Sequence, residues 1–152
     1  MSADNLPDLR LTASMHRREE DLTPACRVAK AFLDCLNKQD AKGIRALLAD
    51  KVQMIGPDGK VCHDPAEFEQ IEVRGFSNME QPWRFELINL LPFGDSGCLM
   101  EFTVSSDSDM PFVPGAVDHF EVDEAGKIVR FVPYIAASWV NKAVSNINKG
   151  HQ

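Results

Sequence analysis

Residues 117–135 read VDHFEVDEAGKIVRFVPYI, and this stretch has the pattern of a β-hairpin. Its two strands are predicted at Val117–Val122 and Ile128–Ile135, because both runs are rich in β-branched and aromatic residues. The intervening residues 123–126, DEAG, have the composition of a tight turn. The stretch therefore predicts that the second half of the chain forms an antiparallel sheet.

Two further strands precede this hairpin, and they are predicted from alternation of apolar and polar residues with a period of two. A turn at Phe93–Gly97 joins them, whereas the polar stretch Ser105–Pro114 is predicted to be a longer loop. The alternating apolar residues are Trp83, Phe85, Leu87, Cys98, Met100, Phe102 and Val104.

Three helices are predicted before these strands. Thr23-Pro24 and Asp64-Pro65 each place a capping residue before a proline, which is typical of helix starts, and Asp40 is expected to cap the second helix. The third helix is expected to direct three residues inward: Ala66, Phe68 and Ile71. Short extended segments are predicted at Val52–Ile55 and Lys60–His63.

Helices that are separated in sequence from a run of antiparallel strands indicate an α+β fold, in which the helices cover one face of a curved sheet. The chain has 152 residues, which fits one domain. We predict an N-terminal arm at residues 1–22, the domain itself at residues 23–138 and a C-terminal tail at residues 139–152.

Charge and hydropathy exclude several kinds of partner. The net charge is −7 and the isoelectric point is about 5.0, so the surface repels the phosphates of nucleic acids. No apolar run approaches the roughly 18 to 20 residues that a membrane span needs. The first 22 residues lack the apolar segment of a signal peptide. We therefore expect a cytoplasmic protein without a nucleic-acid or membrane partner.

No metal or cofactor is expected, because the residue patterns that hold them are missing. There is no Gly-rich phosphate loop, and no metal-binding spacing among the four histidines, which are His16, His63, His119 and His151. No C-x-x-C pair occurs among the four cysteines, which are Cys26, Cys35, Cys62 and Cys98. Buried free thiols are their expected state, with a nucleophilic or redox cysteine as the alternative.

The hairpin also resembles the final strands of the bacterial steroid Δ5-3-ketoisomerase family, which belongs to the NTF2-like superfamily together with the SnoaL-like proteins. The matching residues are Asp118-His119-Phe120 in the strand and Ala125-Gly126-Lys127 in the turn. A second segment, Phe32–Pro57, keeps the family's helix–helix–strand spacing. The resemblance implies an NTF2-like cone, in which three helices pack on a strongly curved, mostly antiparallel sheet around an apolar pocket.

The resemblance implies that Asp118 is an acid kept neutral by apolar surroundings, which donates a hydrogen bond to a developing oxyanion. The family's tyrosine and base positions are occupied here by Phe32 and Gly56, so two of its three chemical groups are absent. His63, near the expected pocket mouth, and Asp58, two residues past Gly56, are candidates for a second catalytic group. A helix-entry histidine and a turn aspartate are the alternatives.

The implied function is cofactor-independent proton-transfer chemistry, as in an isomerase or lyase, on a hydrophobic steroid-, polyketide- or aromatic-like molecule. The residues expected to contact the substrate are Phe32, Met54, Met100, Phe102, Val104, Phe120 and Phe131. The alternative is a non-catalytic module for small-molecule binding or dimerisation. Both readings imply a homodimer that forms through the outer sheet face, where His119 is also expected. The candidate dimer contacts are Val132, Tyr134, Trp139 and Val140.

Overall fold

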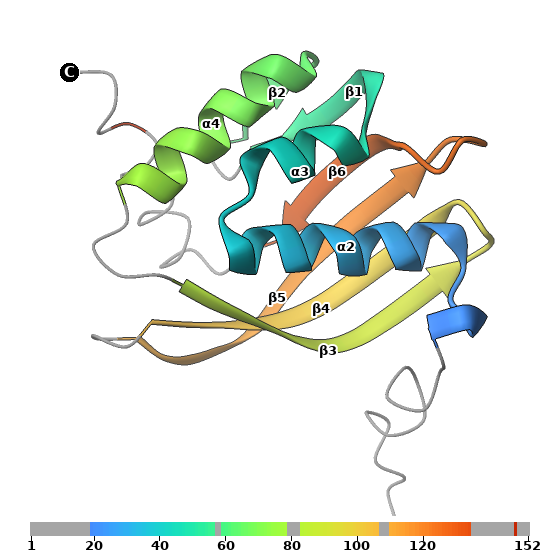
Figure 1. Ribbon diagram of the computed structural model, residues 1–152. Coiled ribbons are helices and arrows are strands. Elements are labelled where there is room, and N and C mark those ends of the chain that lie inside the picture. The colour runs from blue at the N-terminus through green and yellow to red at the C-terminus, as the bar shows by residue number, and fades with distance from the viewer. Residues whose placement is uncertain (1–18, 57–58, 79–82, 107–109, 135–147, 149–152) are drawn as a thin grey trace, which may run out of the picture.

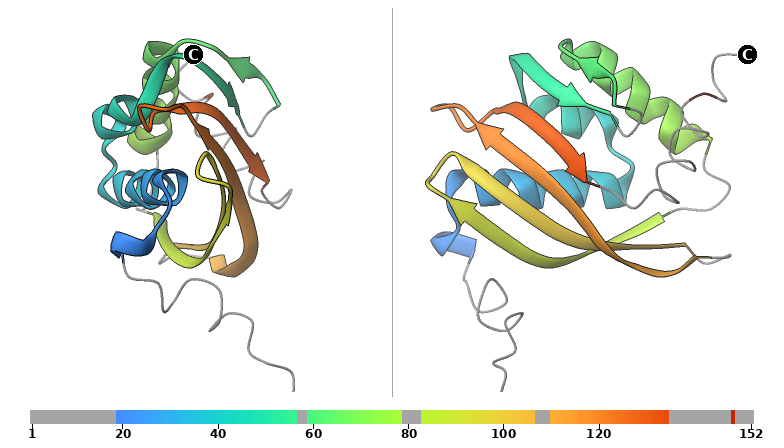
Figure 2. Two further views of the ribbon diagram at one scale, coloured as in Figure 1. Left: turned by 90° about the vertical axis from the view of Figure 1, so that its right-hand side faces the viewer. Right: turned by 180° about the vertical axis from the view of Figure 1, so that it is seen from behind.

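The computed structural model describes residues 19–56, 59–78, 83–106, 110–134 and 148. These residues form a six-stranded sheet in the order β2-β1-β6-β5-β4-β3, and α2, α3 and α4 lie on one side of it (Figure 1). The end-on view in Figure 2 shows that the sheet curves around α2. The predicted α+β fold, with helices packed on a strongly curved sheet, is confirmed.

The helices lie in the first half of the chain, and the long strands lie in the second half. The helices are η2 (Glu19–Asp21, 3-10), α2 (Pro24–Lys38), α3 (Ala41–Leu47) and α4 (Pro65–Ser77). Neighbouring strands pair antiparallel, except that β1 and β6 are parallel. The strands are β1 (Leu48–Ile55), β2 (Val61–Cys62), β3 (Trp83–Phe93), β4 (Gly97–Ser106), β5 (Met110–Val122) and β6 (Ile128–Tyr134).

Side-chain caps start the three α-helices at the predicted residues. The hydroxyl of Thr23 accepts a hydrogen bond from a backbone N–H at 3.3 Å, and the carboxylates of Asp40 and Asp64 each accept one at 2.9 Å. These bonds satisfy N–H groups that have no partner within the helix. The residues at which the three helices begin are therefore set by these local capping interactions.

The turn between β5 and β6 is held by Asp123. Its carboxylate accepts hydrogen bonds from the backbone N–H groups of Ala125 at 3.0 Å and Lys127 at 2.9 Å. Gly126 has a φ of 76°, which favours glycine. The predicted tight turn is confirmed, and it brings Val122 of β5 opposite Ile128 of β6.

One predicted loop is wrong. The stretch Ser105–Pro114 reads as a loop, but β4 continues to Ser106, and β5 begins at Met110 directly opposite it. Backbone pairing between the two strands outweighs the polar, proline-containing composition. Register shifts on both sides of Val104 allow the ladder to continue past the irregular residues. The two strands therefore form a longer hairpin than the sequence pattern predicts.

The core lies between the helices and the concave face of the sheet. Its centre is a group of three rings: Phe32 of α2 is 5.2 Å from Phe120 of β5 and 5.1 Å from Phe131 of β6, and the last two rings are 5.2 Å apart. Phe68 of α4 adds its ring 6.3 Å from Phe131. These contacts join two helices and two strands into one apolar cluster.

The cysteines are free thiols, as predicted. Cys26, Cys62 and Cys98 are buried, and Cys35 is partly buried. The sulfur atoms of Cys26 in α2 and Cys98 in β4 are 3.0 Å apart in the core. Burial raises the pKa of Cys35, which disfavours its thiolate.

Most of the predicted arm at 1–22 and nearly all of the predicted tail at 139–152 fall outside the described residues, so these boundaries stay predictions. Within the described residues, no helix combines the length and the apolar character needed to cross a membrane.

Replacement of Phe32 by alanine should lower the free energy of unfolding by about 3–5 kcal/mol, because the side chain is 2% exposed and its loss leaves a cavity among the three rings. Urea unfolding followed by circular dichroism measures the change. Val73→Ala is the control, because Val73 is 40% exposed on α4 and its truncation should change the value by less than about 0.5 kcal/mol. Equal effects of the two substitutions would contradict the described core.

Candidate functional site

Asp118 lies on the concave face of β5. In the sheet register it stands between Met100 of β4 and Pro133 of β6, and Phe120 follows two residues later on the same face. The residue is 3% exposed, and its Oδ1 atom has no hydrogen-bond partner within the part of the chain that the structure describes. A carboxyl in such surroundings is costly to ionise.

The residues predicted to contact a substrate all belong to one buried hydrophobic cluster. Their exposed fractions lie between 0% and 6%. The members are Phe32, Met54, Met100, Phe102, Val104, Phe120 and Phe131. Several of these side chains lie on the same inner face of the sheet as Asp118. Contact between these residues and a ligand stays a prediction.

A second carboxyl, which the sequence analysis missed, lies on α4. Glu72 is partly buried, and it stands four residues after Phe68 and four residues before Phe76, so the three side chains share one stripe of the helix. Phe68 is 4% exposed, and Phe76 packs against the core. The signal was present in the sequence as an acid flanked by phenylalanines at this helical spacing.

The two carboxyls differ in how readily they ionise. Burial raises the pKa of Asp118 well above its ordinary value of 3.8, and repulsion by the charge of Glu72 raises this pKa further. Burial raises the pKa of Glu72 from 4.5 to about 7. The charge of Glu72 opposes the ionisation of Asp118, so Glu72 ionises before Asp118. One group can accept a proton while the other can donate one, without a cofactor.

Of the two candidates for a second catalytic group, the structure describes one, and it does not join this pair. His63 is exposed, between β2 and the start of α4. Asp58 lies outside the described residues. Within residues 19–56, 59–78, 83–106 and 110–134, no cluster of three or more His, Cys, Asp or Glu side chains could hold a metal ion.

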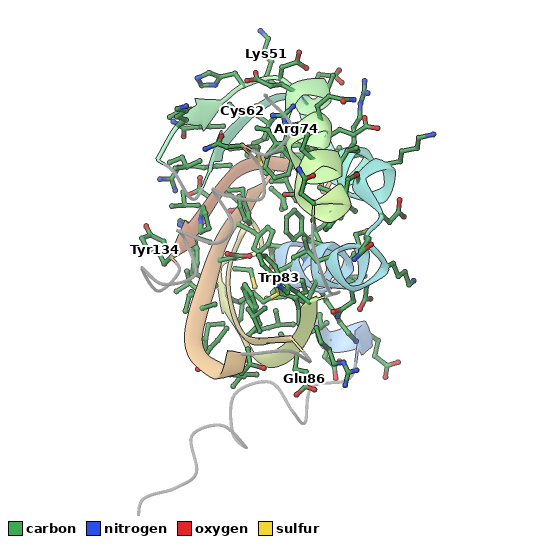
Figure 3. All side chains as sticks on the ribbon, turned by 90° about the vertical axis from the view of Figure 1, so that its left-hand side faces the viewer. Lys51, Cys62, Arg74, Trp83, Glu86 and Tyr134 are labelled. Carbon is green, nitrogen blue, oxygen red and sulfur yellow. The ribbon has the colours of Figure 1, made fainter. Side chains whose placement is uncertain are left out.

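The opposite face of the sheet carries the side chains that alternate with Asp118. The ring of His119 is 5.2 Å from the ring of Phe93, and its Nδ1 is 3.4 Å from Nη1 of Arg130. Tyr134 is 57% exposed and lies on the outer side of the sheet, whereas Trp83 lies on its concave side (Figure 3). The predicted outward orientation of His119 and Tyr134 is confirmed.

Comparison with known proteins agrees with this architecture. The fold is that of the NTF2-like class, with helices on a curved open sheet. A family model described as a SnoaL-like domain matches residues 29–131, and the chain belongs to this family. No curated protein sequence matches the chain.

Several solved structures are similar to this chain. A Mycobacterium tuberculosis protein in complex with estradiol-17β-hemisuccinate is 19% identical, with a TM-score of 0.60, 76% of this chain covered and 96% of the other. A proposed polyketide cyclase of Pseudomonas putida is 23% identical, with a TM-score of 0.60 and coverages of 80% and 98%. A Δ5-3-ketosteroid isomerase of a Mycobacterium species is 20% identical, with a TM-score of 0.59 and coverages of 77% and 96%. At these identities the likeness establishes the shared fold.

Stability should fall as the pH rises from about 4 through 7 and above. The pKa values of Glu72 and Asp118 are higher in the native state than in the unfolded state. Above the pKa values of the unfolded state, the native state therefore still holds protons that the unfolded state has released. The free energy of unfolding then decreases as the pH rises. Each such proton contributes a slope of at most about 1.4 kcal/mol per pH unit. Urea unfolding at several pH values measures the slope.

The double variant Glu72→Gln/Asp118→Asn should flatten this dependence. The matched control is Glu67→Gln, because Glu67 is an exposed acid on the same helix and should leave the slope unchanged. A wild-type protein that gains stability between pH 5 and pH 8 would contradict the described burial.

Proposed function

We propose that the protein is a cofactor-independent enzyme that moves protons on a hydrophobic small molecule, by isomerisation, elimination or cyclisation, with Asp118 as its principal acid. The observation that carries this proposal is a carboxyl that is 3% exposed, opposite Met100, with an oxygen that has no partner among the described residues. Buried polar groups are normally hydrogen-bonded. We therefore propose that the unpartnered oxygen of Asp118 binds an atom of the ligand.

The nature of the surrounding side chains supports a hydrophobic substrate. The cluster next to Asp118 consists of phenylalanine, methionine and valine side chains, which would form the wall of the apolar pocket predicted from the sequence. One similar protein was crystallised with an estradiol ester, another is a ketosteroid isomerase, and a designed protein of this fold binds 17-OHP. These relatives support a steroid- or polyketide-like molecule as the substrate class.

Replacement of Asp118 by alanine should lower kcat by about 10²–10³, the usual cost of losing one donor to a developing oxyanion. The assay follows a Δ5-3-ketosteroid by the ultraviolet absorbance of its conjugated product, with polyketide-like ketones as further probes. Asp118→Asn separates two roles of the acid. The amide retains an N–H donor, so it keeps part of the rate if Asp118 only donates a hydrogen bond, and it fails like alanine if Asp118 transfers its proton.

Glu121→Gln is the control for this series, because Glu121 lies three residues along the same strand and its side chain is 41% exposed. It should retain the wild-type rate. Turnover that is unchanged in Asp118→Ala would eliminate the enzymatic proposal, as would tight binding of the probes with no product from the wild-type protein.

A second candidate function is assembly, and the outer face of the sheet favours it. Leu91 is 43% exposed, Phe93 is 44% exposed and Tyr134 is 57% exposed. The register places Leu91 in the same outer row as His119, two strands away. We propose that a second copy of this chain covers this face, as the sequence predicts. The prediction that Val132 is an exposed contact is wrong, because Val132 is 7% exposed and the chain itself covers it. The other predicted contacts, Trp139 and Val140, lie outside the described residues.

The double variant Leu91→Asp/Tyr134→Asp should convert the dimer to a monomer, because it places charge on the proposed contact face. Light scattering during size-exclusion chromatography measures the mass. Val73→Asp is the control, since it adds a charge at a similarly exposed position on α4. A wild-type protein that elutes with the mass of one chain would refute the dimer and leave the enzymatic proposal untouched.

A further inference from the structure

We propose that Glu72 is the proton-accepting group of this site, paired with Asp118 as the proton donor. The proposal rests on the proposed function, and it assigns to α4 the role that Gly56, at the family's base position, cannot perform. The catalytic pair would then consist of one carboxyl from a helix and one from the sheet, on two sides of the apolar interior.

A ring contact between α4 and β6 points to a position of Glu72 near the row of the sheet that contains Asp118. Phe68 of α4 contacts Phe131 of β6, with ring centroids 6.3 Å apart. Both elements run in the same direction in Figure 1. One helical turn from Phe68 leads to Glu72 over about 6 Å, and two residues along β6 lead from Phe131 to Pro133 over about 7 Å. Pro133 is the direct neighbour of Asp118.

The surroundings of Glu72 keep it in the interior rather than in an ion pair. Its neighbours on the same helical stripe are Phe68 and Phe76, and both pack in or against the core. Arg74 lies two residues further on, which is about 200° around the helix and therefore on another side of α4. Glu72 is thus held by apolar contacts on its own helix.

The charged groups on the elements that pack against α4 are engaged elsewhere or exposed. Arg45 of α3 bonds Glu69, with Nη1 and Oε2 2.7 Å apart. On β1, Asp50 and Lys51 are exposed, and on β2 the neutral thiol of Cys62 donates to the backbone carbonyl of Asp64. Arg130 of β6 donates to Gln53 and lies near His119, on the outer face. Glu72 and Asp118 interact across the interior, because the charge of Glu72 raises the pKa of Asp118.

The division of roles follows from the order in which the two groups ionise. The pKa of Glu72 lies at about 7, close to the value that suits a general base at neutral pH. The pKa of Asp118 is raised by burial and by the charge of Glu72, so Asp118 stays protonated when Glu72 is ionised. In such a pair the ionisation of one carboxyl opposes the ionisation of the other, so the two groups titrate as a unit.

The reaction this pair supports is a proton transfer next to a carbonyl group. The Glu72 carboxylate takes a proton from the carbon beside the carbonyl, and the electrons of the broken C–H bond move to the carbonyl oxygen, which Asp118 stabilises with its proton. Return of the proton from Glu72 to carbon restores the carbonyl and the carboxylate, so no oxidant or reductant is consumed. The negative charge of Glu72 selects neutral ketones over carboxylates as substrates.

Carbon-detected NMR titration of the carboxyl groups tests the pair in the protein without any ligand. Glu72 should titrate near pH 7, and Glu72→Gln should lower the pKa of Asp118, because it removes the repelling charge. Glu67→Gln, with an exposed acid on the same helix, should leave both groups unchanged. A Glu72 that titrates near 4.5, or an Asp118 pKa that is indifferent to Glu72→Gln, would overturn the inference whatever the activity.

Kinetics with the Δ5-3-ketosteroid and neutral ketone probes then separates the role of Glu72 from that of Asp118. Glu72→Gln should lower kcat by about 10²–10⁴ with little change in KM, and Glu72→Asp should recover part of the rate. Full activity of Glu72→Gln beside an inactive Asp118→Ala would overturn the role of Glu72 and leave the proposed function standing. A wild-type protein that turns over none of the probes, although the two carboxyls titrate as a pair, would remove the enzymatic proposal and the catalytic role together.

Discussion

The burial of one carboxyl on the concave face of β5 is the constraint on which the site depends. The pKa of Asp118 is raised chiefly because the sheet on one side and the helices on the other keep water away from it. The same enclosure shifts Glu72, since its raised pKa also comes from burial. A flatter sheet or a more distant α4 would return both groups to ordinary acids, and the fold and the chemistry are therefore not separable here.

The position of α4 is set by contacts at several points along its length. Asp64 caps its first turn, the Arg45–Glu69 ion pair fastens it to α3, and Phe68 anchors it to the ring cluster. An ion pair with one exposed partner contributes little to stability by itself. The ion pair instead orients α4. It holds the Glu69 side of the helix toward α3, so that the stripe of Phe68, Glu72 and Phe76 faces the interior. Two acids three residues apart thus serve different purposes.

Local chemistry accounts for most of what the sequence predicted. The three helix starts and the turn at Asp123 follow from short-range capping rules, and each is confirmed. The long β4–β5 hairpin was not predicted, because pairing between strands overrode composition. Glu72 was missed for a related reason: periodicity searches count apolar residues, so an acid within an apolar stripe looks like a break in it. Which of the acids on a helix is buried depends on the elements that cover it, and these are distant in sequence.

The parallel pairing of β1 with β6 has a consequence for the order of assembly. Leu48 lies beside Ile128, 80 positions later in the chain, whereas β3 to β6 are joined by successive hairpins. Pairing between distant segments carries a larger loop-closure entropy than pairing across a turn. We expect the meander to form first and β1 to dock late. During synthesis, β1 would therefore pair with β6 only after almost the whole domain has left the ribosome.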